Sequence, residues 1–119
     1  MCDILKKVHN SSQDNIKRKG LYEVQIEKSE FTSFSKQSFV FSHNEAVVDL
    51  GEHWLELGYS KELRNEFIKH RKKPLWGIQA HPESSYTFGK NSGLVKNLRD
   101  SDLLDGYNFL DSFIYFITL

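Results

Sequence analysis

The chain has 119 residues, of which 39% are apolar and 13% aromatic, which suits one small folded domain and argues against disorder. Sixteen Lys and Arg balance sixteen Asp and Glu, so charge gives no reason to expect nucleic acid or an anionic membrane as a partner. The single cysteine, Cys2, excludes an internal disulfide, and the most apolar stretch, residues 109–119, is about half the ~20 residues that span a bilayer. We therefore expect a soluble, cytoplasmic protein.

The first half of the chain predicts a series of β-strands. Residues 4–8 are helix-compatible, and a polar loop separates them from residues 21–27. In this second segment Tyr22, Val24 and Ile26 alternate with Glu and Gln, which predicts a half-buried strand. Further β-rich runs follow at residues 38–42, at 46–50 with a turn at Gly51, and at 54–60.

The second half predicts a hairpin and then helices. Residues 63–70 and 75–80 flank a basic turn that ends at Pro74, as two hairpin strands would. Because residues 75–78 are uniformly apolar, we expect a central strand that is buried on both faces. Residues 89–98 predict a helix, and the acidic segment 100–102 can cap the next one. That C-terminal helix, over residues 103–117, has apolar residues three to four apart: Leu103, Tyr107, Leu110, Ile114 and Ile117.

The polar triplet His81-Pro82-Glu83 stands at the end of the predicted buried strand. A histidine there can act as a general base near neutral pH. A carboxylate two residues later can accept a hydrogen bond from the other ring nitrogen. Pro82 fixes its own φ and restricts His81 before it to extended conformations. The triplet therefore predicts a rigidly placed base and its orienting carboxylate, as nucleophilic catalysis requires.

The segment Trp76-Gly77-Ile78-Gln79-Ala80-His81-Pro82-Glu83-Ser84 resembles the Gly-Val-Gln-Phe-His-Pro-Glu signature of class I glutamine amidotransferases. Upstream, Phe41-Ser42-His43-Asn44-Glu45-Ala46-Val47 is similar to the family's Ser-His-x-Asp-x-Val segment, whose backbone groups help hold glutamine. The resemblance covers roughly residues 18–100. It implies an α/β fold for residues 1–119: a single truncated, flavodoxin-like amidotransferase domain with a mixed sheet, a hairpin and C-terminal helices.

The same resemblance implies site residues and partners. His81 and Glu83 would be catalytic, and Ser42 and His43 would bind the substrate glutamine. In the family a cysteine on a Gly-x-Cys-x-Gly elbow attacks the glutamine side-chain amide and releases ammonia, but this chain has no such elbow and Cys2 has no glycine beside it. We therefore expect the C-terminal half of a glutaminase site, inactive without a cysteine-bearing half that comes from a separate chain or from a longer natural protein. We also expect a synthase subunit that accepts the ammonia.

Three other interpretations stay open from the residues. The chain can be a non-catalytic remnant or binding module of the same fold. It can resemble a γ-glutamyl peptide hydrolase, which uses the same Cys-His framework. A third possibility is a metal site formed by His43, His81 and Glu83, although the five histidines show no ligand spacing, so we expect no metal and no cofactor.

Overall fold

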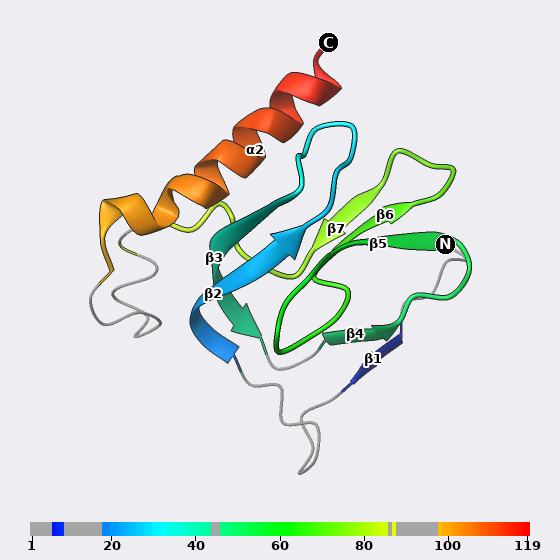
Figure 1. The fold of residues 1–119 in the computed structure, drawn as a ribbon, viewed down its shortest axis with the longest axis horizontal. Helices are drawn as coiled ribbons and strands as arrows, with labels where there is room; N and C mark the ends of the chain where they lie inside the picture. The colour runs from blue at the N-terminus through cyan, green and yellow to red at the C-terminus, as the bar shows by residue number, and fades with distance from the viewer. Residues whose placement is uncertain (1–5, 9–17, 44–45, 86, 88–97) are drawn as a thin grey trace.

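A computed structural model of the chain describes residues 6–8, 18–43, 46–85, 87 and 98–119. Within these residues it forms seven strands, a 3-10 helix and an α-helix (Figure 1). The predicted helix over residues 89–98 lies almost wholly outside them. The elements are β1 (Lys6–Val8), β2 (Arg18–Ile26), β3 (Ser35–His43), β4 (Ala46–Asp49), β5 (Trp54–Tyr59), β6 (Phe67–His70), β7 (Trp76–Ile78), η1 (Asp100–Leu103) and α2 (Leu104–Ile117).

The main sheet has the strand order β3-β2-β5-β6-β7, and it curls into a half-barrel beside helix α2 (Figure 1). The predicted mixed, flavodoxin-like sheet is wrong for the described part of the chain, where every strand pair is antiparallel. The connections explain why: the segments that join β2 to β3, β5 to β6 and β6 to β7 are short loops, whereas parallel strands need a long crossover. The predicted helical start is also wrong over residues 6–8, because β1 pairs with β4 in a separate small sheet.

Strand β2 confirms the predicted alternation. Val24 and Ile26 are fully buried and Tyr22 packs against the same core, while Glu23 on the other face is exposed. All nine residues of β2 pair with β3, from Arg18 opposite His43 to Ile26 opposite Ser35. In contrast, β2 pairs with β5 at only two positions, Gln25 with Tyr59 and Ile26 with Gly58, because β5 ends at Tyr59 and does not extend towards the Arg18 end.

The predicted hairpin is confirmed, but its second strand is not central. Strand β7 pairs with β6 and lies at the end of the strand order, and its three residues are only partly buried. A short apolar run shows that side chains are covered, not that both neighbours are strands. After β7 the chain passes from one side of the curved sheet to the other. The Gln79 N–H donates to Glu66 O at 2.9 Å, next to β6, and the His81 N–H donates to Val40 O of β3 at 2.8 Å. This segment therefore joins the β6 side of the sheet to its β3 edge.

An aromatic cluster fills the space between the sheet and α2. Phe31, in the loop between β2 and β3, has ring centroids 5.2 to 6.1 Å from five other rings, those of Phe67, Trp76, Phe109, Phe113 and Phe116. Phe109 also meets Phe39 and Phe67 edge-on, which is a favourable ring geometry. These contacts place the main core under α2.

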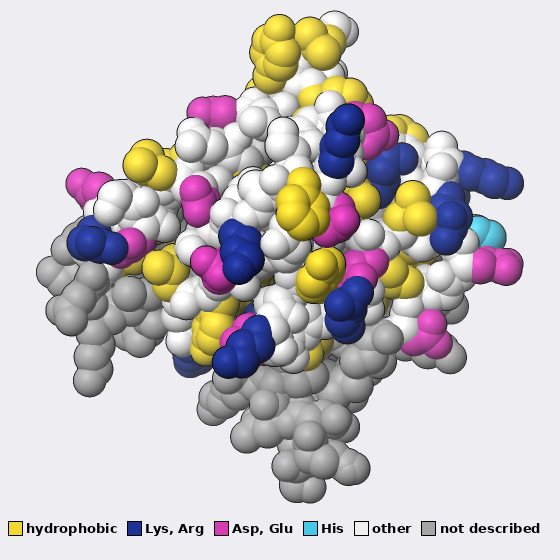
Figure 2. Space-filling model, in the orientation of Figure 1, with side chains coloured by type: hydrophobic (Ala, Val, Ile, Leu, Met, Phe, Trp, Pro, Cys, Tyr) yellow, Lys and Arg dark blue, Asp and Glu magenta, His cyan; other side chains and the backbone are white. Residues whose placement is uncertain are grey.

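Helix α2 has the predicted extent but buries a different face. Its packed residues are Gly106, Phe109, Phe113 and Phe116. Of the predicted apolar face, Leu103 is buried and Leu110 is partly buried, whereas Tyr107, Ile114 and Ile117 are exposed. Both sets have three-to-four spacing, so periodicity alone could not choose between them. Apolar side chains consequently remain on the surface near the C-terminus, at the top of Figure 2, and no helix among the described residues is long and apolar enough to cross a membrane.

The acidic segment 100–102 caps the helical region through Asp102. Its carboxylate accepts the Arg99 backbone N–H at 2.9 Å and the Arg99 guanidinium at 3.1 Å. These bonds hold the pKa of Asp102 below its usual value, and the bond from the Arg99 backbone makes the larger contribution. Leu103 and Leu98 then bury against Val40 on the face of β3 that points away from the main core.

Phe109→Ala tests the core assignment. Removing a buried ring that touches three others is expected to lower the free energy of unfolding by roughly 3–5 kcal/mol. Denaturant unfolding measures the loss. The matched control is Tyr115→Ala on the same helix, where the ring is 69% exposed and the change should stay within about 0.5 kcal/mol. Equal losses at both positions would refute this packed face of α2.

Candidate functional site

The loop after β7 brings His81 and Glu83 into contact, as the sequence predicted. His81 Nδ1 lies 2.9 Å from Glu83 Oε2, with the His81 side chain 37% exposed and that of Glu83 63% exposed. Pro82 between them is buried, and the Ser84 N–H donates to His81 O at 3.1 Å, so the backbone forms a tight turn. The carboxylate can therefore hold the ring with its proton on Nδ1. Nε2 is then the ring nitrogen that can accept a proton from a reacting group.

Three consecutive residues at the start of α2 join the helix to its neighbours: Asp105 binds β3, while Gly106 and Tyr107 contact this loop. Asp105 Oδ2 accepts the Ser38 backbone N–H of β3 at 2.7 Å, and the Tyr107 hydroxyl donates to Ser84 O at 3.0 Å. Between them, Gly106 lies directly against Pro82, since a Cβ added there would be 2.5 Å from the Pro82 carbonyl oxygen. The sequence reasoning missed Gly106, although a glycine inside an amphipathic helix is a signal of close packing.

The described residues do not enclose a substrate beside the dyad. The cavity that His81 lines together with Val40, Pro82 and Leu103 has a volume of about 10 Å³. That is about the space of a single water molecule, far below the several hundred Å³ of a ligand pocket. The dyad is thus an accessible surface feature within the part of the chain that the structure describes.

The two predicted substrate-binding residues lie on opposite faces of β3. Successive side chains alternate along a strand, so His43 shares the main-core face with Phe41, and their rings are 5.8 Å apart. Ser42 shares the other face with Val40, which is bridged to His81. Residues directly paired across an antiparallel bridge point the same way, so Ser42 and His81 belong to one side of β3 and His43 to the other.

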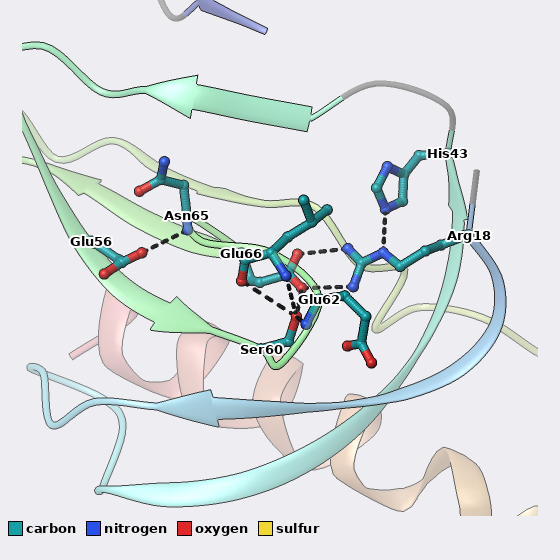
Figure 3. Close-up of polar contacts among 8 residues, drawn as sticks. Arg18, His43, Glu56, Ser60, Glu62, Asn65 and Glu66 are labelled. Atoms are coloured by element: carbon teal, nitrogen blue, oxygen red, sulfur yellow. Dashed lines mark hydrogen bonds and ion pairs between the residues drawn. The ribbon is translucent and has the colours of Figure 1, made fainter. Parts of the chain in front are cut away.

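His43 instead belongs to a buried polar cluster formed by Arg18, His43, Ser60 and Glu66 (Figure 3). Arg18 Nη1 and Nη2 each donate to a carboxylate oxygen of Glu66 at 2.7 Å, and Arg18 Nε donates to His43 Nε2 at 3.0 Å. The Ser60 hydroxyl donates to Glu66 at 2.6 Å. Arg18 and Glu66 are 5% and 1% exposed, so this is a fully buried, bidentate ion pair.

Arg18 is also stacked on an aromatic face. Its guanidinium carbon lies 4.1 Å from the ring centroid of Phe41 and 5.3 Å from that of Tyr22. Sequence reasoning missed Arg18 and Glu66 as site residues. The sequence contained a signal for Arg18, because it is an even number of residues from Tyr22, Val24 and Ile26. In a strand it therefore lies on the same inward face as they do.

The remaining candidates are not brought together. Among the described residues no group of three or more His, Cys, Asp or Glu could hold a metal ion, so His43, His81 and Glu83 do not form the metal site considered above. Cys2 and residues 88–97 lie outside the described part of the chain. On the face shown in Figure 2, basic and acidic side chains are interspersed.

Comparison with known proteins shows a distant, partial similarity to GMP synthase. Residues of this chain are 35% identical to GMP synthase (glutamine-hydrolyzing) of Francisella philomiragia over 68 residues, which are 54% of this chain and 13% of that protein. The identity to a GMP synthase (glutamine-hydrolyzing) subunit of Methanococcus aeolicus is 38% over 58 residues, 49% of this chain and 28% of that one. No family model matches the chain.

A solved structure shares the fold. The crystal structure of a protein described as a GMP synthase subunit, from Thermoplasma acidophilum, superposes with a TM-score of 0.61 at 15% sequence identity. The superposition covers 96% of this chain but only 51% of the other, so this chain spans about half the length of that protein. The chain is therefore similar over part of its length to glutamine-hydrolyzing GMP synthases, and it shares the fold of about half of a GMP synthase subunit.

Gly106→Ala tests the contact between α2 and the His81–Glu83 loop. Alanine favours a helix by up to about 1 kcal/mol over glycine, but the new Cβ would overlap backbone atoms of Pro82, and overpacking costs roughly 1–3 kcal/mol. We expect a net loss of stability together with amide chemical-shift changes concentrated at residues 81–84. Asn108→Ala, at an exposed position of the same helix, is the control. A stabilised Gly106→Ala variant would disprove the close contact.

The buried ion pair predicts a non-additive mutant cycle. Arg18→Met leaves the Glu66 carboxylate buried without its cation and should cost about 3–5 kcal/mol, whereas Arg18→Met with Glu66→Met should recover most of that loss. Denaturant unfolding of the two single variants and the double variant measures the coupling. Additive losses would mean that the two side chains do not act as a pair.

Proposed function

We propose that this chain carries the His-Glu half of a glutaminase site that hydrolyses the side-chain amide of glutamine and releases ammonia. On this proposal it corresponds to the C-terminal half of a class I glutamine amidotransferase domain. The observation that carries the proposal is the contact between His81 Nδ1 and Glu83 Oε2 at 2.9 Å. It supports the proposal because it occurs in a chain that is similar to glutamine-hydrolyzing GMP synthases.

His81 would act as the proton carrier and Glu83 as its orienting partner. A cysteine thiol from the cysteine-bearing half would give its proton to His81 and attack the amide carbon, so that a C–S bond forms and the C–N bond breaks. His81 would return the proton to the departing nitrogen, and ammonia would leave. His81 would then take a proton from a water molecule, whose oxygen attacks the thioester carbon and breaks the C–S bond. Glutamate is released, and His81 returns the proton to the cysteine sulfur.

The open position of the dyad agrees with an incomplete site. Among the described residues His81 lines a cavity of about 10 Å³, and the chain spans about half of the solved protein whose fold it shares. The cysteine and the remaining wall of the pocket would come from the cysteine-bearing half, on a separate chain or elsewhere in a longer protein, and a synthase subunit would use the ammonia. Ser42, on the His81 side of β3, is the better placed of the two proposed glutamine-binding residues, and His43 would contribute through its backbone.

The second candidate is a non-catalytic remnant or binding module of the same fold. It is favoured by the missing Gly-x-Cys-x-Gly elbow and by the lack of an enclosing pocket among the described residues. A γ-glutamyl hydrolase-like peptidase would use the same dyad and would differ in accepting γ-glutamyl peptides in place of free glutamine.

Ammonia release in trans tests the proposal. The chain would be mixed with the part of the Methanococcus aeolicus GMP synthase subunit that lies outside the matched region, with glutamine as substrate. We expect ammonia from the mixture but none from the isolated chain, because its sequence has no Gly-x-Cys-x-Gly elbow. Removing a general base typically costs 10²- to 10⁴-fold, so His81→Gln should lower the rate by at least about 100-fold.

Matched variants make this result interpretable. His53→Gln changes a histidine that is 54% exposed, on the turn before β5 and apart from the dyad, and should leave the rate unchanged. Cys2→Ser in the isolated chain shows whether the native thiol contributes. Ammonia release from the isolated chain that disappears in Cys2→Ser would overturn the two-chain proposal. No release from any mixture, with all components folded, would favour the remnant.

A further inference from the structure

The hydrogen bond between Arg18 and His43 fixes which ring nitrogen of His43 carries a proton. A guanidinium is always protonated and can only donate, so His43 Nε2, 3.0 Å from Arg18 Nε, must present its lone pair. A neutral imidazole has one proton, which must then be on Nδ1. We infer that Arg18 is a positioning residue that holds His43 as the neutral Nδ1–H tautomer.

The surroundings of Arg18 make this arrangement rigid. Arg18 and His43 are direct partners at the end of the β2–β3 ladder, so the side chains meet across neighbouring strands. Glu66 binds both terminal guanidinium nitrogens, which leaves Nε directed at His43. The Phe41 ring lies under the guanidinium at 4.1 Å and fixes its plane. Arg18 therefore has little freedom to turn away from His43.

Glu66 is itself held by other residues of β5 and of the loop between β5 and β6. Ser60, after β5, donates its hydroxyl to Glu66 Oε2, and Ser60 Oγ also accepts the Leu63 N–H at 3.0 Å. The Glu66 N–H donates to Gly58 O at 2.9 Å. A continuous set of contacts thus runs from the loop between β5 and β6, through Glu66 and Arg18, to the His43 end of β3 (Figure 3).

This assignment separates the two histidines of the candidate site. The lone pair of His43 is committed to Arg18, so His43 cannot accept a proton without losing that bond, and it would then present a positive ring to a guanidinium. Proton transfer falls to His81, while His43 anchors the end of β3 next to Ser42. The division of roles rests on the proposed function, but the tautomer of His43 does not.

Ring nitrogen NMR of the ¹⁵N-labelled full chain tests the inference. Long-range proton–nitrogen correlations distinguish a protonated ring nitrogen from one with a lone pair, and the His43→Gln spectrum identifies the His43 signals by their loss. At neutral pH we expect the protonated nitrogen of His43 to be Nδ1. A proton on Nε2, or protons on both nitrogens, would overturn the inference. This outcome is independent of the ammonia assays, which test the proposed function.

A double variant shows whether Arg18 is the cause. Arg18→Met with Glu66→Met removes the donor without leaving a buried charge, and we expect His43 to shift towards the Nε2–H form that isolated histidine favours. If the folded double variant keeps the Nδ1–H form, Arg18 does not set the tautomer.

A second pair of variants keeps the test decisive should the double variant not fold. Glutamine can place its amide oxygen near the position of His43 Nε2 and so accept from Arg18, while asparagine is too short to do so. Because a bond to a charged donor is involved, the equilibrium constant for unfolding should be roughly ten-fold larger for His43→Asn than for His43→Gln. Equal constants, or a more stable asparagine variant, would count against the inference.

Discussion

The buried pair of Arg18 and Glu66 is the interaction on which the curl of the main sheet depends. Strand β5 pairs with β2 at only two positions and ends at Tyr59, so the ladder does not extend to the Arg18 end of β2. Arg18 and Glu66 join the two sides where the ladder does not. Two buried charges are unfavourable unless their hydrogen bonds are satisfied, and here Ser60, His43 and the Phe41 ring complete their surroundings. The polar cluster is therefore part of the architecture and not only of the site.

The candidate site is assembled from segments that different forces hold. Helix α2 fixes the His81–Glu83 loop by close packing at Gly106 and by a hydrogen bond from Tyr107. Strand β3 is fixed at one end by Asp105 and at the other by the Arg18 cluster. A base and its carboxylate work only in a defined geometry, so these supports matter as much as the dyad. They also give physical reasons for residues that touch no reacting atom.

Much of the strand content followed from the sequence, because alternation in β2 and the basic turn between β6 and β7 are local signals. The His81–Glu83 contact also followed, since two residues around a proline have few arrangements. Global features did not follow. The apolar run of β7 could not reveal that its neighbours are one strand and a helix, and both faces of α2 carry apolar residues at helical spacing. Which face packs is decided by Phe31, from a distant loop, and local periodicity contains no information about it.

The bridge between His81 and Val40 has a consequence for how such a chain can change over time. Position 81 contributes twice: its main chain ties the two margins of the curled sheet together, and on the proposed function its side chain would carry the proton. The first contribution needs only an amide hydrogen, which every residue except proline provides. The proposed chemistry and the architecture are thus separable at this one position, so a descendant can lose the imidazole and still inherit the shape.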